Sequence, residues 1–273
     1  MHSADGARLE IGQWLADVLQ PGRKVLLIGN NKYGAPQNPL RCCRNDAEDM
    51  RDALVQLDFE CTLLLDASRR QMTDGIRDFI ATLRPNDVVF LYFSGHGAEL
   101  AGVTYLLPVD FGRGSLCDDA VSLNGVMQQL NRKNLDLLNI VVLDCCRANR
   151  TDDTFKGDEL SRGEEEEALM KGISSVRLPT SGQFFIAYPS DPGTVAFESS
   201  TDRNGYFTGC LLPLLREPGL KLTEIFFRAN RQLQTKSSKR QRAWQHMSLH
   251  DDLVLFGLND QTAAASPSSS SSH

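Results

Sequence analysis

The sequence lacks any apolar run near the roughly 20 residues that a membrane-spanning helix needs, and we therefore expect no membrane association. No apolar stretch follows a basic one near residue 1, so we expect no secretory signal and a cytoplasmic location. The net charge is −6, so the chain also lacks the positive charge that would attract nucleic acid or an anionic membrane surface.

Paired metal-binding motifs are missing as well. The chain has seven cysteines at irregular spacing, and no C-x-x-C has a second one to complete a structural zinc site. We expect free thiols in a reducing compartment, and no cofactor or metal ion. Acidic clusters at 118–119, 152–153 and 164–167 contain no EF-hand pattern, so a calcium dependence has no recognisable motif behind it.

Hydrophobic spacing predicts one α/β domain. Short apolar runs predict strands at 25–28, 59–65, 87–93, 137–143, 184–188 and 253–256. Helical spacing predicts helices at 8–20, 46–57, 69–83, 123–133, 207–215 and 223–235. Strands that alternate with helices indicate a mostly parallel six-stranded sheet, flanked by helices on both faces.

Composition divides the chain further. We expect an N-terminal extension with a short helix at 1–22, a folded domain at 23–260 and a disordered Ser-rich tail at 261–273. A polar stretch at 151–180, too long for an ordinary connection, separates the halves 23–150 and 181–260.

Two of the predicted strands end in residues that carry chemistry. The third leads into Ser94-Gly95-His96-Gly97, and the fourth into Asp144-Cys145-Cys146-Arg147. Sites in open parallel sheets lie beyond the carboxyl ends of the strands. If these two strands are neighbours, His96 and Cys146 project into the same crevice.

This pairing predicts nucleophilic catalysis. A cysteine attacks as thiolate, and an adjacent imidazole takes its proton and later returns it to the leaving amine. The backbone N–H groups of Gly97 and Cys146 would face the developing oxyanion. A lone histidine or cysteine at a strand end is more often only structural, so the hypothesis depends on the two occurring together.

Several motifs carry a family resemblance. They are KVLLIGNNKY (24–33), ALVQLDFECTLLLD (53–66), LYFSGHGAE (91–99), YLLPVD (105–110), VVLDCCRANR (141–150) and AFE (196–198). With these motifs the chain resembles the paracaspases, within the group of caspases, metacaspases and paracaspases, in which the histidine precedes the nucleophile by about 50 residues. The resemblance implies a caspase-like fold with large- and small-subunit-like halves. It also selects Cys146 over Cys145, and Arg147-Ala148-Asn149 after the nucleophile favours the paracaspase branch.

The resemblance further implies cleavage after Arg or Lys. By similarity, the acidic residues of the specificity pocket correspond to Asp46, Asp144 and Glu198. A closed pocket for a guanidinium needs carboxylates in fork geometry. From the sequence alone, each residue also has a structural interpretation: Asp46 as a helix cap, Asp144 as a turn residue and Glu198 as a surface charge.

Two further expectations concern processing and assembly. The polar stretch contains basic residues, so an enzyme with this specificity would cut itself within 150–178. Caspase-like domains commonly pair through their last strand, which predicts a homodimer through 253–256.

Two alternatives to a peptidase remain from the sequence. One is a catalytically inactive caspase-like scaffold or regulatory module. Intact His96, Cys146 and pocket acids argue against it. The other is a redox sensor that uses Cys145-Cys146, which the strained geometry of a bridge between adjacent cysteines disfavours. Cys145 is expected to point into the core instead.

Overall fold

The computed structural model describes residues 21–100, 102–133, 138–145, 148–149, 183–190, 201–250 and 252–255. Three predicted segments lie outside these residues: the helix at 8–20, the whole polar stretch at 151–180 and the tail at 261–273. No helix in the described ranges combines the length and the apolar character that crossing a bilayer requires.

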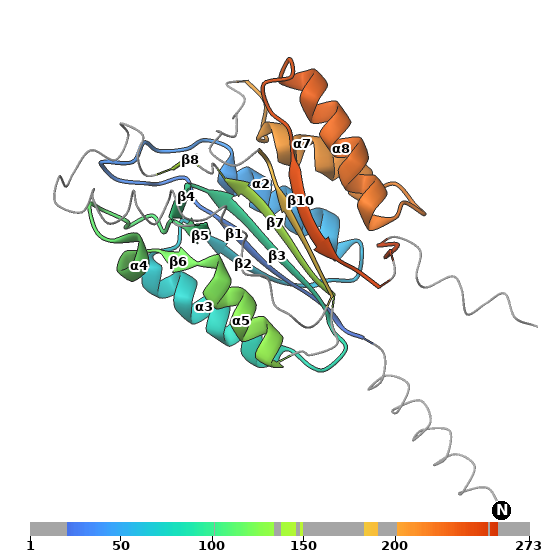
Figure 1. Ribbon diagram of the computed structural model, residues 1–273, viewed down its shortest axis with the longest axis horizontal. Helices are drawn as coiled ribbons and strands as arrows, with labels where there is room; N and C mark the ends of the chain where they lie inside the picture. The colour runs from blue at the N-terminus through green and yellow to red at the C-terminus, as the bar shows by residue number, and fades with distance from the viewer. Residues whose placement is uncertain are drawn as a thin grey trace, which may run out of the picture.

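A central sheet of six strands organises the molecule (Figure 1). Its strands are β1 (Arg23–Gly29), β2 (Glu60–Leu65), β3 (Val88–Gly95), β7 (Leu138–Cys145), β9 (Gln183–Tyr188) and β10 (Trp244–Ser248). They lie in the order β10-β9-β7-β3-β1-β2, and only the β9–β10 pair is antiparallel. The predicted mostly parallel α/β sheet is confirmed.

Helices cover both faces of this sheet (Figure 1). One face packs against α2 (Cys43–Val55), α7 (Tyr206–Leu215) and α8 (Leu222–Lys236). The other packs against α3 (Arg69–Thr82) and α5 (Leu123–Lys133). Because side chains alternate along a strand, Val25 and Leu27 enter the first core while Leu26 and Ile28 enter the second. This explains why the central strands read as unbroken apolar runs.

A second, smaller sheet has the strand order β6-β5-β4-β8. It consists of β4 (Gly97–Leu100), β5 (Val103–Leu106), β6 (Val121–Ser122) and β8 (Ala148–Asn149), with the short helix α4 (Leu116–Asp119) beside it. None of these four strands, nor α4, was predicted from the sequence. Strands of two to four residues are too short to show a period of hydrophobicity.

The prediction of the last strand was wrong. At the predicted position 253–256, the described residues form only an isolated bridge between Val254 and Lys221. The sixth strand is β10, whose residues are mostly polar and partly exposed. The apolar run was misleading because Leu253 and Leu255 pack against the core under α8 instead of pairing in the sheet.

Candidate active site

The pairing of β3 with β7 determines which residues meet at the carboxyl edge of the sheet. The two strands are parallel neighbours, and their register pairs Ser94 with Asp144 and Gly95 with Cys145. His96 directly follows β3, and Cys146 follows Cys145 in the chain but lies outside the described residues. The two chain positions that precede His96 and Cys146 therefore lie opposite each other.

His96 is held at both its backbone and its ring. Its backbone N–H donates to the Tyr33 hydroxyl at 2.9 Å, and its carbonyl accepts from the Leu107 N–H at 3.0 Å. The ring is edge-on to the ring of Tyr33, with 4.5 Å between centroids. Ring atom Nε2 lies 2.7 Å from the carbonyl oxygen of Asn38, in the loop between β1 and α2. Sequence reasoning missed Asn38, because a backbone carbonyl leaves no signal in residue type.

The contact with Asn38 selects one tautomer of the imidazole. A carbonyl oxygen only accepts hydrogen bonds, so Nε2 must carry the proton in that pair. In the neutral ring, Nδ1 is then the unprotonated nitrogen. The geometry thus assigns the basic lone pair of His96 to Nδ1.

Gly95 is required for close approach. A Cβ at this position would lie 2.5 Å from the Tyr33 hydroxyl and 2.8 Å from the Phe93 ring. The close approach of Tyr33 therefore explains why this position is a glycine. Burial raises the pKa of Tyr33 well above its ordinary value, so its hydroxyl keeps its proton and donates to the Leu107 carbonyl at 3.0 Å.

Two carboxylates come together beside this edge. Asp46 lies in the first turn of α2 and is only 1% exposed, while Asp144 is in β7. A Cβ at Gly205 would lie 3.2 Å from Oδ2 of Asp46 and 3.3 Å from Oδ2 of Asp144. The structure therefore brings together two of the three predicted pocket acids. The third, Glu198, lies outside the described residues.

The N-terminus of α7 supplies donors to both carboxylates. The N–H of Gly205, the N-cap, donates to Asp46 at 3.0 Å, and the N–H of Thr208 donates to Asp144 at 3.2 Å. Aligned peptide dipoles make a helix N-terminus favourable for negative charge. Two segments distant in sequence thus combine to accommodate buried acidic groups.

Hydroxyl groups complete the network. The Thr208 hydroxyl donates to Asp144 at 2.6 Å and lies 2.5 Å from the hydroxyl of Tyr92. Ser94 donates to Asp46 at 3.2 Å. Tyr92, Ser94 and Thr208 could not be found from the sequence, because these common residue types form no motif. Only the fold reveals them, because it packs α7 against the face of β3 that carries Tyr92 and Ser94.

The electrostatics of the pair are unfavourable for two full charges. Burial, and then the charge of Asp144, raise the pKa of Asp46 to about 8, although hydrogen bonds from Gly205, Asn204 and Ser94 act in the opposite direction. At neutral pH Asp46 therefore holds a proton for most of the time. A cation beside both carboxylates would relieve the repulsion between them.

A surface ion pair holds the α7 approach against α2. The guanidinium of Arg203 meets the Asp49 carboxylate through two nitrogens, both at 2.9 Å, and Asn204 donates to the same group at 2.9 Å. Burial alone would raise the pKa of Asp49, but these partners lower it below its ordinary value. This contact precedes Gly205 directly and so keeps the N-terminus of α7 close to Asp46.

The other candidates have different surroundings. Gly97 begins β4 and pairs with Leu106. Cys145 is 1% exposed and packs in the core beneath α3 and α5, as expected of a small apolar residue. Within the described residues, no group of three or more His, Cys, Asp or Glu side chains is placed to hold a metal ion.

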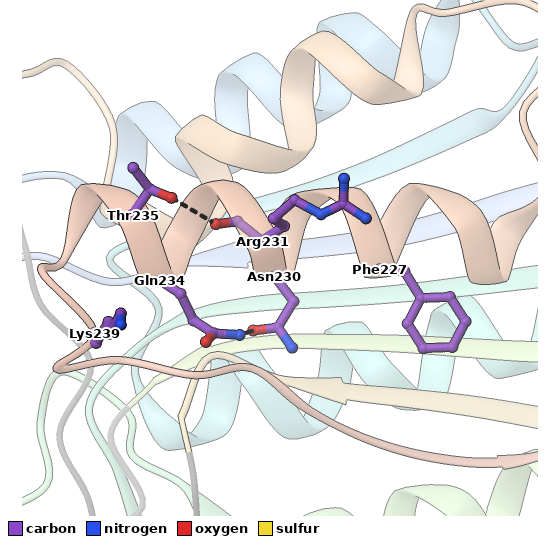
Figure 2. A pocket seen from close by; sticks show the side chains of 6 residues that line it. All are labelled: Phe227, Asn230, Arg231, Gln234, Thr235 and Lys239. Carbon is purple, nitrogen blue, oxygen red and sulfur yellow. Dashed lines mark hydrogen bonds between the residues drawn. The ribbon is translucent and has the colours of Figure 1, made fainter.

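A groove of about 600 Å³ runs along α8 and the turn that follows it (Figure 2). Its lining residues are Phe227, Asn230, Arg231, Gln234, Thr235 and Lys239. This lining contains no carboxylate, cysteine or histidine. The groove therefore belongs to a different surface from the carboxylates and the histidine.

Parts of this sequence resemble known proteins. The family model described as "Caspase domain" matches residues 22–254. The human mucosa-associated lymphoid tissue lymphoma translocation protein 1 is 30% identical over 139 residues, which cover 50% of this chain and 16% of that protein. Metacaspase-1 of Schizosaccharomyces pombe is 32% identical over 32% of this chain and 23% of the relative. For Metacaspase-5 of Trypanosoma brucei brucei, the identity is 32% over 46% of this chain and 28% of the relative. The alignments thus span less than a third of each relative's length.

The raised pKa of Asp46 predicts how stability depends on pH. Between about pH 4 and about pH 8 the folded chain holds a proton at Asp46 that the unfolded chain releases, so this group's contribution to stability falls as pH rises. Asp46→Asn should therefore raise the melting temperature by a few degrees at about pH 9, and by much less at about pH 5.

Asp49→Asn is the matched control, one turn along the same helix. The Asp49 pKa is lowered, so its stabilisation exists above the ordinary pKa of aspartate and is lost in acid. The control should lower the melting temperature at neutral pH. Equal losses from both variants at about pH 9 would show that the Asp46 carboxylate is not destabilising.

Proposed function

Because this chain belongs to the caspase-domain family of cysteine peptidases, we propose that it is a cysteine endopeptidase with Cys146 as nucleophile and His96 as general base. The observation that carries the proposal is the register of β3 and β7, which aligns Gly95 with Cys145. A thiolate at the next position would attack the scissile carbonyl and form an acyl-enzyme, which water then hydrolyses.

The tautomer of His96 supports its role as base. With Nε2 donating to Asn38, Nδ1 carries the lone pair that would take the thiol proton and later give it to the leaving amine. The Asn38 carbonyl would stabilise the imidazolium that forms, because hydrogen bonds from charged donors are the stronger ones. Backbone N–H groups of Gly97 and Cys146 remain the predicted oxyanion donors. This chemistry needs no metal ion or organic cofactor.

The buried carboxylates support cleavage after Arg or Lys. A guanidinium or ammonium between Asp46 and Asp144 would relieve their mutual repulsion and displace the proton on Asp46. The donors from α7 fix both carboxylates before the substrate arrives. An aspartate at P1 would bring a further negative charge beside Asp46 and Asp144, which already repel each other, so the caspase preference for Asp is disfavoured. Glu198 is the predicted third acid.

A fluorogenic peptide assay tests the activity and its specificity. We expect turnover with Arg or Lys at P1 and none with Asp. Cys146→Ala should lower kcat/KM by about 10³-fold or more, and His96→Gln by about 10²–10⁴-fold. Asp144→Asn should raise KM for the Arg peptide by about 100-fold, because it removes one partner of a buried charge pair.

Cys145→Ala is the control for the identity of the nucleophile. This thiol lies in the core, so its loss should cost some stability and little activity. Mapping a covalent Arg-based inhibitor to Cys145 would overturn the assignment. A wild-type chain that binds Arg peptides without turnover would favour the alternative, an inactive scaffold.

Self-processing follows from the same specificity. The stretch 150–178 contains the basic residues Arg150, Lys156, Arg162, Lys171 and Arg177. We expect purified wild type to accumulate fragments that end at one or more of these residues, as intact-mass spectrometry would show. Cys146→Ala should stay uncut. Equal fragmentation of both proteins would assign the cleavage to a contaminating protease.

Homodimerisation is a further part of the proposal, now assigned to β10 in place of 253–256. This strand forms one edge of the sheet, and in the described part of the chain it pairs only with β9. Its Trp244 and Met247 are 39% and 43% exposed. An open edge with apolar side chains favours pairing with a second copy around a two-fold axis.

Light scattering coupled to size exclusion tests this interface. Met247→Lys should shift the chain from dimer to monomer, because a charge would be buried where the edges meet. The matched control is Val55→Lys, since Val55 is an exposed apolar residue of α2. This control should remain dimeric. A monomeric wild type at high concentration would contradict the dimer.

A further inference from the structure

The loop between β1 and α2 carries the carbonyl that faces the catalytic imidazole. Asn38 is exposed, and only its backbone oxygen meets Nε2 of His96, at 2.7 Å. A backbone carbonyl on a surface loop keeps a fixed position relative to the imidazole only if another group holds the loop. The amide of the neighbouring residue, Gln37, is such a group.

Gln37 is a buried polar residue, 8% exposed, and directly precedes Asn38. One end of its amide faces two carbonyl oxygens, those of Phe111 and Gly34. An amide oxygen there would meet only acceptors, so the nitrogen takes that side. It then donates to Phe111 at 2.7 Å and to Gly34 at 3.2 Å. The Gln37 side chain thus binds a carbonyl of its own loop, that of Gly34, and a carbonyl of a segment distant in sequence, that of Phe111.

The segment that receives Gln37 also holds His96. Between Leu107 and Phe111, the Leu107 N–H donates to the His96 carbonyl at 3.0 Å, and the Phe111 N–H donates to Pro108 at 3.1 Å. The Tyr33 hydroxyl, which binds the His96 backbone, donates to Leu107 at 3.0 Å. Two residues of the loop are therefore anchored to the short platform that holds His96: Tyr33 near the start of the loop, and Gln37 directly beside Asn38. Gln37 is the anchor next to the carbonyl that meets the imidazole.

The base of the loop is closed independently. The Asn31 carbonyl accepts from Leu40 at 2.9 Å, and the Asn31 side chain donates to Arg41 at 3.0 Å. The Asn31 N–H donates to Asp66 at 2.8 Å, and Asp66 also pairs with Arg44 at 2.5 Å. Losing Gln37 would therefore free the tip of the loop while its stem stays attached.

We propose that Gln37 is a positioning residue for the catalytic base: its amide holds the Asn38 carbonyl against Nε2 of His96 and so keeps the lone pair on Nδ1. The catalytic consequence rests on the proposed peptidase function, whereas the effect on the tautomer does not. Without this contact, the neutral imidazole would distribute its proton between the two nitrogens, and only one of these forms has the basic lone pair on Nδ1.

Nitrogen-15 NMR of the full chain, labelled at histidine, measures this directly. The wild type should show His96 in the Nε2–H tautomer, with its signals identified by their loss in His96→Gln. Gln37→Glu keeps the shape of the side chain but removes both N–H donors, so it should convert His96 to a mixture of tautomers. An unchanged pattern in this folded variant would overturn the proposal.

Two further variants separate positioning from folding. Gln37→Met fills the same space without donors or charge and should give the same mixture if Gln37→Glu does not fold. Gln241→Glu is the matched control, because Gln241 is also buried and its amide donates to a loop carbonyl, Pro189, at 2.9 Å. The control should lose stability and leave the His96 tautomer intact. If Gln241→Glu also gave a mixture of His96 tautomers, the effect of Gln37 would be a general loss of stability, and the proposal would be wrong.

Kinetics provide the second measurement. Gln37→Met should lower kcat by about 10–100-fold and leave KM within about twofold, since the loop faces the base and not the carboxylates. A tautomer mixture with unchanged kcat would refute the catalytic role. If the wild type shows no turnover, the proposed function fails, and the NMR result still decides whether Gln37 positions His96.

Discussion

The parallel pairing of β3 with β7 is the constraint on which the rest of this site depends. It aligns Ser94 with Asp144 and Gly95 with Cys145, so whatever follows each strand emerges at the same edge. Strand alternation then sorts the side chains. Tyr92 and Asp144 face α2 and α7, whereas Cys145 enters the opposite core. A slip of one residue would move each of these groups to the wrong face.

The two carboxylates at this edge of the sheet repel each other in a buried position. Burying the charges of Asp46 and Asp144 costs free energy, and the hydrogen bonds from the N-terminus of α7 offset only part of it. The pKa of Asp46 is raised because the rest of this cost remains. Because the pKa of Asp46 is raised in the folded chain, the contribution of this group to stability falls as pH rises toward that pKa.

The histidine and the carboxylates are supported by separate structures. The β1–α2 loop and the Leu107–Phe111 platform hold His96, while α7 and the Arg203–Asp49 pair hold the acids. The platform joins the small sheet directly, which gives this accessory sheet a function: it ties the loop to the strand end. The histidine and the acids are therefore anchored independently of each other.

Hydrophobic periodicity alone determined that this chain forms a parallel sheet between helices, since the middle of each central strand is buried on both faces and is almost entirely apolar. Sequence also identified His96, Cys146 and the acids as candidates, because reactive residue types at strand ends and family motifs are local signals. Only the tertiary structure decided that β10, and not 253–256, completes the sheet, because pairing depends on backbone neighbours that polar residues provide equally well. It alone assigned Asn38, Gln37 and Thr208 to the site, since backbone carbonyls and ordinary polar side chains acquire a role only when distant segments come into contact.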